Sequence, residues 1–294
     1  GIIEEDITKA TQMEVVAGGE EVIEKTPSSF DRSVAPVPGP DPSITLPEIW
    51  KSEASNGMKL YGIGQHELPL VVYSIVIEGG HLLDDPAKPG VARFTASMLN
   101  EGTKNRTPEQ LEEEIQLLGA IINIGCSDER ITVSVNTLAR NFEKTLALVQ
   151  EMLLEPRWDE EQFSLNKTRT VNNLKRNLAD PNYVAGAAYD KLVLGADNIL
   201  SVDLSGTVES VEAITMDDLK LFYNKNISPS VANFIIVGDI DQARVEKALA
   251  GLSEGWAPKE VVIPALSFPP APEKSAIYFV NIPDAKQSVI NIAN

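Results

Sequence analysis

The stretch PGVARFTASMLNEGTKNRTPEQLEEEIQLLGA, residues 89–120, predicts two helices joined by a turn. Its first half places apolar side chains at helical spacing, at Val91, Phe94, Met98 and Leu99. A neighbouring face carries Arg93, Ser97 and Glu101, each four residues from the next, and we expect this helix to end at Gly102.

The second half predicts a helix that begins with Thr107 as its N-cap and Pro108 as its first residue. Its apolar stripe consists of Leu111, Ile115 and Leu118, and Gly119 ends it. We expect the two helices to lie together across one face of a sheet.

The order of short motifs in this stretch resembles that of a known family. The motifs are Gly90-x-Ala92-x-Phe94 at the start of the first helix, Glu101-Gly102-Thr103 after it, and Leu118-Gly119-Ala120 at the end of the second helix. The stretch is similar to the zinc-binding region of the pitrilysin/insulinase peptidases, which include the mitochondrial processing peptidases. Active members carry H-x-x-E-H on the first helix. Residues 93–97 of this chain read R-F-T-A-S at those five positions.

The chemistry of that motif requires two histidines to hold zinc and a glutamate to deprotonate the metal-bound water. Arg93 is a permanent cation that would repel zinc, Ala96 cannot act as a base, and Ser97 is a poor zinc ligand. The resemblance, aligned on Asp180-Pro181, places the family's third ligand, a glutamate, at Asn173.

We therefore expect no catalytic residue and no metal ligand in this chain. Arg93, Ser97 and Asn173 are degenerate ligand positions, Ala96 is the degenerate base position, and zinc is expected in an active partner or half. Arg93 then either pairs with an acidic residue in the vacated pocket, which we favour, or is exposed. Substrate-binding residues are not identified.

The composition indicates a globular chain of 294 residues with a net charge of −18. So acidic a chain argues against nucleic acid and anionic membranes as partners; it favours basic peptides, or else serves solubility alone.

No apolar run is long enough to span a bilayer. The single cysteine, Cys126, allows no internal disulfide. The compartment stays open, with bacterial periplasm or cytoplasm as the expectation for a soluble chain.

The pattern along the chain predicts an α+β fold, with a mixed, mainly antiparallel sheet and helices packed on one face. Expected strands are 58–63 and 70–78, taken as a pair, then 121–127, 131–138 and 231–238. Further expected helices are 142–153, 160–178, 182–194, 208–213, 216–225 and 242–251.

Three segments are expected along the chain: an N-terminal segment with a Pro-rich linker over 1–47, the α+β domain over 48–256, and residues 257–294. The resemblance implies that this unit is repeated in the family. Residues 257–294 would then be a connector and the first strands of a second, truncated copy.

Two histidines and two pairs of aspartates are further candidates for chemistry. His66 and His81 are expected to be surface or hydrogen-bonding histidines, with a shared metal as the alternative. Ser97 as a nucleophile would need one of them as its base. The pairs Asp84-Asp85 and Asp239-Asp241 are read as solvated turn residues, with a calcium site as the alternative.

The resemblance and the missing ligands together imply a non-catalytic half or subunit of a pitrilysin-type zinc peptidase. It would help to form a peptide-binding chamber with a homologous catalytic half, around a peptide substrate. The alternatives are a structural assembly subunit without a peptidase role, and an active zinc metallopeptidase whose site is completed elsewhere.

Overall fold

The computed structural model describes residues 33, 35, 38–39, 47–270, 276–283 and 287–292. The chain divides into two units, residues 1–46 and residues 47–294, and each of the described helices and strands lies in the second. The linker expected before residue 48 falls almost entirely outside the described residues. The boundaries expected at residues 47 and 256 stay predictions.

A six-stranded sheet forms the centre of the second unit, with the strand order β1-β2-β6-β3-β5-β4. The strands are β1 (Trp50–Glu53), β2 (Lys59–Gly64), β3 (Leu70–Glu78), β4 (Ile121–Cys126), β5 (Arg130–Leu138) and β6 (Ala232–Gly238). β2 and β6 run parallel, and the other four neighbouring pairs are antiparallel. The prediction of a mixed, mainly antiparallel sheet is confirmed.

The prediction that residues 58–63 and 70–78 pair with each other is wrong. β6 lies between β2 and β3, in parallel register with β2 and antiparallel register with β3. β2 instead forms a hairpin with β1, a strand that the sequence pattern did not indicate, around the turn at Asn56-Gly57.

Eight α-helices follow the order of the chain in the described residues: α2 (Val91–Met98), α3 (Pro108–Leu117), α4 (Phe142–Leu154), α5 (Glu160–Asn177), α6 (Pro181–Leu194), α7 (Val208–Ala213), α8 (Met216–Asn226) and α9 (Gln242–Gly255). Short 3-10 turns are η1 (Gly80–Leu83), η2 (Ala139–Asn141), η3 (Ile199–Ser201) and η4 (Pro229–Val231). Thr107 caps α3 as expected, and its hydroxyl accepts the backbone N–H of Gln110.

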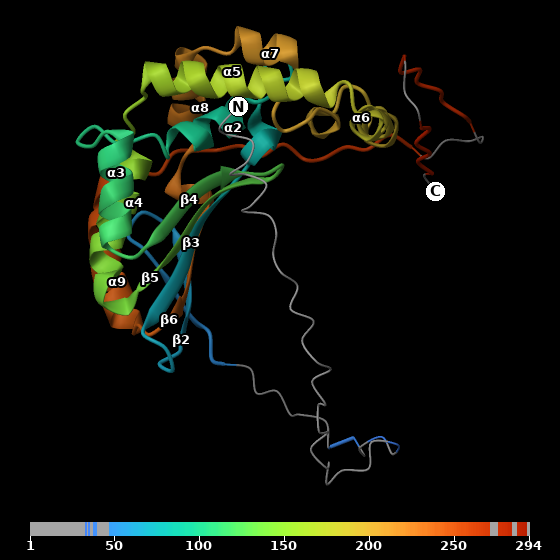
Figure 1. The fold of residues 1–294 in the computed structure, drawn as a ribbon. Coiled ribbons are helices and arrows are strands. Elements are labelled where there is room, and N and C mark those ends of the chain that lie inside the picture. Colours follow the sequence, from blue (N-terminus) through green and yellow to red (C-terminus); the bar gives the residue numbers. More distant parts are fainter. Residues whose placement is uncertain are drawn as a thin grey trace, which may run out of the picture. The chain divides into compact units, whose positions relative to one another are not determined.

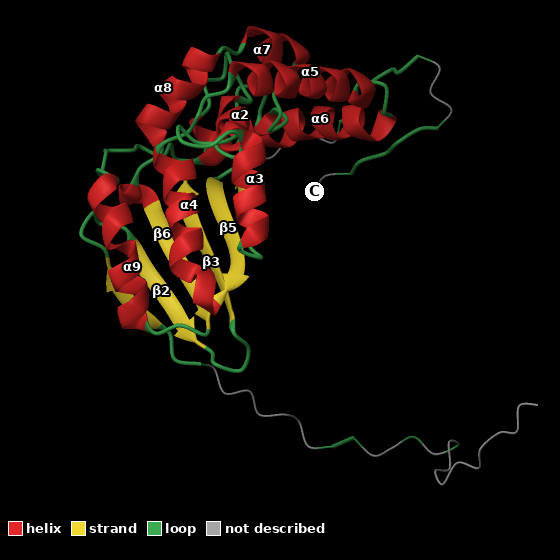
Figure 2. Ribbon diagram, turned by 60° about the vertical axis from the view of Figure 1, so that its left-hand side comes forward, coloured by secondary structure: helices red, strands yellow, loops and turns green. Residues whose placement is uncertain are grey.

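The helices form two groups. α3, α4 and α9 cover one face of the sheet, which confirms the expected packing on one face (Figure 2). α2, α5, α6, α7 and α8 gather beyond one end of the strands (Figure 1). α2 belongs to the group beyond the strands, where it packs against α8 and the end of β4, whereas α3 lies on the face of the sheet, so the expectation that α2 and α3 lie together across one face is wrong.

The core lies between the sheet and α4. Tyr73 of β3 is 1% exposed, and its ring stacks on Phe234 of β6 with centroids 5.3 Å apart. The edge of Phe142, the first residue of α4, meets the same ring at 5.6 Å. Val72, the residue before Tyr73 in β3, points to the opposite face of the sheet and is 51% exposed.

The segment after α9 forms no helix or strand in its described residues, 257–270, 276–283 and 287–292. The family resemblance implied strands after residue 276, but Ile277 is 99% exposed there. A strand is held by hydrogen bonds to a neighbouring strand, and none of the described strands borders this segment.

Candidate functional site

The helix α2 carries three of the four positions that the sequence singled out. Arg93 is exposed, and its guanidinium donates a hydrogen bond to the hydroxyl of Ser205. The expectation that Arg93 is a buried partner of an acidic residue is therefore wrong. Its side chain leaves the helix toward the loop between η3 and α7 because Ser205 and Gly206 pass close to the start of α2.

Ala96 and Ser97 face the inside of the helical group. Ala96 is 1% exposed, so its methyl group is part of the core. Ser97 is half-buried, and its hydroxyl accepts a hydrogen bond from the amide of Asn166 on α5 at 3.3 Å. The same amide group lies 3.4 Å from a carboxylate oxygen of Glu101. Asn166 thus links α5 to this face of α2, in addition to the ring contact between Phe163 and Phe94.

Asn173, the fourth position, is exposed on α5, and its carbonyl oxygen accepts a hydrogen bond from Arg176 at 2.9 Å. It follows Asn166 by seven residues, so it lies on the same side of α5 about 10 Å further along the helix axis. Among the described residues, Ser97 therefore contacts Asn166 of α5, whereas the hydrogen-bond partner of Asn173, Arg176, is on the same helix as Asn173.

These donors do not suit zinc. Zn²⁺ binds thiolate sulfur, imidazole nitrogen and carboxylate oxygen, whereas the positions offer a guanidinium, a hydroxyl and an amide. Within the part of the chain that the structure describes, no three His, Cys, Asp or Glu side chains lie together as a metal site. Arg93, Ser97 and Asn173 therefore do not fit a zinc ion, and the lack of catalytic residues in this chain stays a prediction.

A buried histidine and aspartate lie just before α2, where the sequence predicted a surface or hydrogen-bonding histidine and a solvated turn aspartate. His81 is 0% exposed and Asp84 is 6% exposed, so the reading of Asp84 as solvated is wrong. The carboxylate of Asp84 accepts the backbone N–H groups of Gly90 and Ala92, each at 2.7 Å. A negative charge at a helix N-terminus is favourable, so Asp84 caps α2 from six residues upstream.

The imidazole of His81 joins this cap to the loop that follows α6. Its Nδ1 donates to Asp84 at 2.8 Å, and its Nε2 donates to the carbonyl oxygens of Ile199 and Val202, each at 3.1 Å. All three partners are acceptors, so both ring nitrogens must carry a hydrogen to satisfy them. The arrangement therefore favours the charged imidazolium.

Burial alone would lower the pKa of His81, because it penalises the charged ring. The hydrogen bond to Asp84, the charge of that carboxylate and the carbonyl of Val202 outweigh this effect, and the pKa is raised. The signal that the sequence offered was the spacing of a histidine and an aspartate just before a predicted helix.

The second histidine lies elsewhere. His66 is exposed, and its Nδ1 is 2.7 Å from Asp239, whereas its Nε2 is 4.0 Å from Asp241. The hydrogen bond to Asp239 raises the pKa of His66. His66 and His81 have separate partners, so among the described residues they do not form a shared metal site. Neither histidine contacts Ser97, whose described partner is Asn166, so neither is placed to act as its base.

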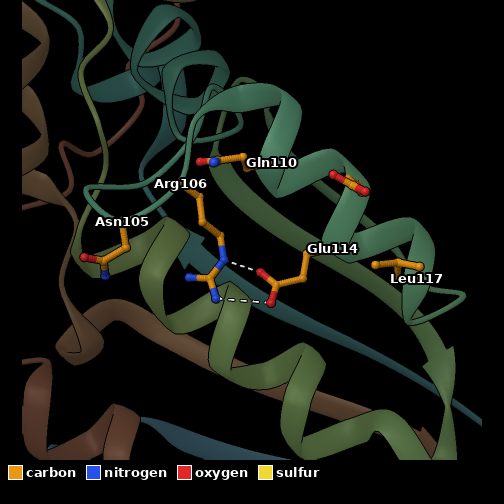
Figure 3. Close-up of a pocket in the computed structure, with 6 residues that line it drawn as sticks. Asn105, Arg106, Gln110, Glu114 and Leu117 are labelled. Carbon is orange, nitrogen blue, oxygen red and sulfur yellow. Dashed lines mark hydrogen bonds and ion pairs between the residues drawn. The ribbon is translucent and has the colours of Figure 1, made fainter.

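A hollow of about 490 Å³ lies beside α3, away from these positions (Figure 3). It is lined by Asn105, Arg106, Gln110, Glu113, Glu114 and Leu117. Arg106 points across it and pairs with Glu114 of α3 and Glu151 of α4. Because the guanidinium of Arg106 pairs with a glutamate from each of the two helices, Arg106 braces α3 against α4 at this hollow.

Two models of one peptidase family match the chain. The model described as "Insulinase (Peptidase family M16)" matches residues 65–193, and the one described as "Peptidase M16 inactive domain" matches residues 213–294. Together they cover more than half of the chain.

Curated relatives carry several kinds of name, and two of them are called uncharacterized zinc proteases. A "Non-peptidase homolog YmxG" of Helicobacter pylori is 28% identical over 66% of this chain and 46% of its own length. The beta subunit of the mitochondrial-processing peptidase of Blastocladiella emersonii is 22% identical over 78% and 50%. Subunit 1 of the cytochrome b-c1 complex of Bos taurus is 21% identical over 76% and 46%. The chain thus spans about half the length of the curated relatives it matches.

A solved structure supports the fold. The crystal structure described as a peptidase M16 inactive domain from Pseudomonas fluorescens superposes with a TM-score of 0.70 at 22% identity. The match covers 75% of this chain and 54% of that one.

Among the described residues, none of the helices combines the length and the apolar character that crossing a membrane requires.

Proposed function

Because the chain belongs to the insulinase (M16) family of peptidases and their homologues, we propose that it is a non-catalytic half or subunit of such a zinc peptidase. In this proposal it forms a peptide-binding chamber together with a homologous half that carries an intact H-x-x-E-H and the zinc. The non-peptidase name of one relative and the subunit names of two others support the proposal.

The observation that carries the proposal is the state of α2. The helix is well formed and Asp84 caps its start, yet it presents Arg93, Ala96 and Ser97 where a zinc site needs two histidines and a glutamate. Ala96 is packed in the core and Ser97 holds Asn166, so the helix now serves packing. The net charge of −18 supports basic peptides as the class of substrate.

The test measures zinc content and peptide hydrolysis of the purified chain, alone and mixed with a homologue that carries H-x-x-E-H. We expect the chain alone to hold far less than one zinc per molecule and to cleave no peptide. We also expect it to form a complex with the homologue and to raise the rate of peptide hydrolysis. Stoichiometric zinc with chelator-sensitive hydrolysis by the chain alone would instead establish the active enzyme as the correct alternative.

A structural assembly subunit is the second candidate, and the similarity to a cytochrome b-c1 subunit favours it. The same mixing experiment separates the two functions. A stable complex whose rate of peptide hydrolysis equals that of the homologue alone supports the structural role. We expect either protein to act in the bacterial periplasm or cytoplasm, which cell fractionation measures directly.

A further inference from the structure

The outer edge of the sheet at β4 is paired with a side chain instead of a strand. β4 is the last strand in the order of the sheet, so the side of it that faces away from β5 has no neighbouring strand among the described residues. Asn100, in the turn directly after α2, lies against this side. Its side-chain oxygen accepts the backbone N–H of Ile124, and its side-chain nitrogen donates to the carbonyl oxygen of the same residue, each at 2.9 Å. Asn100 therefore pairs with Ile124 as a residue of an added strand would.

A third contact fixes the orientation of this amide. The side-chain nitrogen of Asn100 also donates to the carbonyl oxygen of Ala96, in the last turn of α2, at 3.0 Å. Carbonyl groups in the last turn of a helix have no partner within the helix, so this bond satisfies one of them. The nitrogen must face the two carbonyl groups and the oxygen must face the N–H group of Ile124. The side chain is therefore held between α2 and β4.

The position of Ile124 within β4 decides what remains open along the edge. Successive residues of an antiparallel strand direct their backbone groups alternately to one neighbour and to the other. Because the N–H and C=O groups of Ile124 face outward, those of Ile122 and Cys126 face outward as well, and the residues between them face β5. An added strand pairs with every second residue of an edge, so β4 offers three positions. Asn100 occupies the middle one, which leaves no two consecutive positions open.

Other elements hold the chain at both ends of β4. Just before the strand, the backbone N–H of Ala120 donates to the carbonyl oxygen of Ile115 in α3 at 3.1 Å. Just after it, the backbone N–H of His81 in η1 donates to the carbonyl oxygen of Ser127, also at 3.1 Å. A strand that was added to this edge would have to displace α3 or η1 to extend past β4.

The opposite edge of the sheet is protected differently. β1 has only four residues, and its exposed side chains are those of Lys51 and Glu53. Short strands with charged side chains are a usual way of keeping a sheet edge from pairing with another chain. β4 has six residues and none of them is charged, so the contact with Asn100 takes over this role there.

We propose that Asn100 closes the β4 edge of the sheet to an extended peptide strand. The backbone pairing that would hold such a strand at the middle of β4 is already made within the chain. One consequence rests on the proposed function: a peptide in the chamber contacts this chain through side chains and charge, and not by backbone pairing along β4. The role of Asn100 itself is independent of that function.

The test is the binding of a fluorescent peptide to the full chain, measured by anisotropy. The peptide has the sequence of residues 130–138, RITVSVNTL, which form the strand that pairs with β4 on its other side. We expect Asn100→Ala to bind it roughly tenfold more tightly than the wild type, because two backbone hydrogen bonds become available to the peptide. The matched control is Asn123→Ala, which removes an exposed asparagine of β4 and should bind like the wild type.

Amide exchange at Ile124 is the second readout. Asn100→Ala should speed this exchange, and saturating peptide should slow it again. Asn100→Asp keeps a side chain of the same size and an acceptor for the N–H of Ile124 but loses the donor to its carbonyl oxygen. This variant should bind the peptide with an affinity between those of the wild type and Asn100→Ala, and it tests the proposal if the alanine variant does not fold, as circular dichroism shows.

Equal affinity of the wild type and both Asn100 variants would overturn the proposal. If all of them bind, the edge is open although Asn100 is present; if none binds, the side chain is not what closes it. Binding by Asn123→Ala as tight as that by Asn100→Ala would also overturn it, because the peptide would then bind elsewhere. Neither zinc nor a homologous half takes part in this experiment, so its result is separate from the test of the proposed function.

Discussion

The imidazole of His81 and the carboxylate of Asp84 are both enclosed by protein, and together they join η1, the start of α2 and the loop at η3. An ion pair out of water is costly to break, since removing one partner leaves the other charge buried and unpaired. At the scale of single residues, this pair therefore carries the clearest consequences for stability.

Replacing His81 by Gln is expected to lower the free energy of unfolding by about 3 kcal/mol below pH 6.5, because Asp84 loses its charged partner. Urea unfolding of both proteins measures this difference. The pKa of His81 is raised in the folded state from its ordinary 6.5. The stabilisation is therefore fully present below pH 6.5 and is lost as the pH rises through the folded-state pKa.

The control for this experiment is His66→Gln, which removes an exposed histidine that also faces two aspartates. Solvent screens its interactions, so its urea midpoint should shift far less at every pH. A difference between wild type and His81→Gln that grows with rising pH would contradict the charged imidazolium.

The sequence alone could not reveal this pair as buried. The two carbonyl partners of His81 lie 118 and 121 residues further along the chain. A single sequence predicts local periodicity and caps, such as Thr107 before α3, but not which distant loop covers a histidine. The same limit explains Arg93, whose partner Ser205 lies 112 residues away.

The second residue-scale prediction concerns the degenerate ligand positions. Two histidines four residues apart on a helix point the same way and grip one metal ion. We expect Arg93→His with Ser97→His to create zinc binding that the wild type lacks, measured by calorimetry, and Arg93→His alone to create much less. Equal zinc binding by the wild type would contradict the reading of Arg93 and Ser97 as unsuited to the metal.

At the scale of elements, the local sequence pattern predicted the bounds of helices and strands better than it predicted which strands lie side by side. Residues 70–78 and 208–213 were predicted with the bounds that β3 and α7 have. The pairing of β2 with β3 was wrong, because β6 enters between them from residues 232–238, more than 150 residues after β3. Sheet order depends on such non-local contacts, which periodicity does not encode.

The packing of α4 on the sheet gives the element-scale prediction. Phe142 is 0% exposed and meets the ring of Tyr73 edge-on. Replacing Phe142 by Ala should lower the free energy of unfolding by about 3–5 kcal/mol, the cost of a large-to-small change in a packed core. Chemical denaturation followed by circular dichroism measures it.

Leu117 of α3 provides the matched control, because it is 78% exposed on a helix of the same layer. Leu117→Ala should change the free energy of unfolding by less than about 0.5 kcal/mol. A loss for Phe142→Ala no greater than this would mean that α4 is not held on the sheet by its first turn.

At the scale of the whole molecule, the chain has 43 acidic and 25 basic residues, so its net negative charge creates an electrostatic field around it. This field attracts basic peptides within about one Debye screening length, which is about 10 Å at 0.1 M ionic strength and 3 Å at 1 M. Charge on this scale governs association and solubility, and it says nothing about the fold.

We expect the chain to bind a lysine-rich peptide more tightly than an acidic peptide of equal length and apolar content, measured by fluorescence anisotropy. Raising the ionic strength from 0.1 M to 1 M shortens the screening length about threefold, so the affinity for the basic peptide should fall while that for the acidic peptide rises slightly. A preference that is independent of salt would place recognition in apolar contacts instead. Equal affinity for both peptides at low salt would mean that the negative charge serves solubility alone, and the substrate class named in the proposed function would then lose its support.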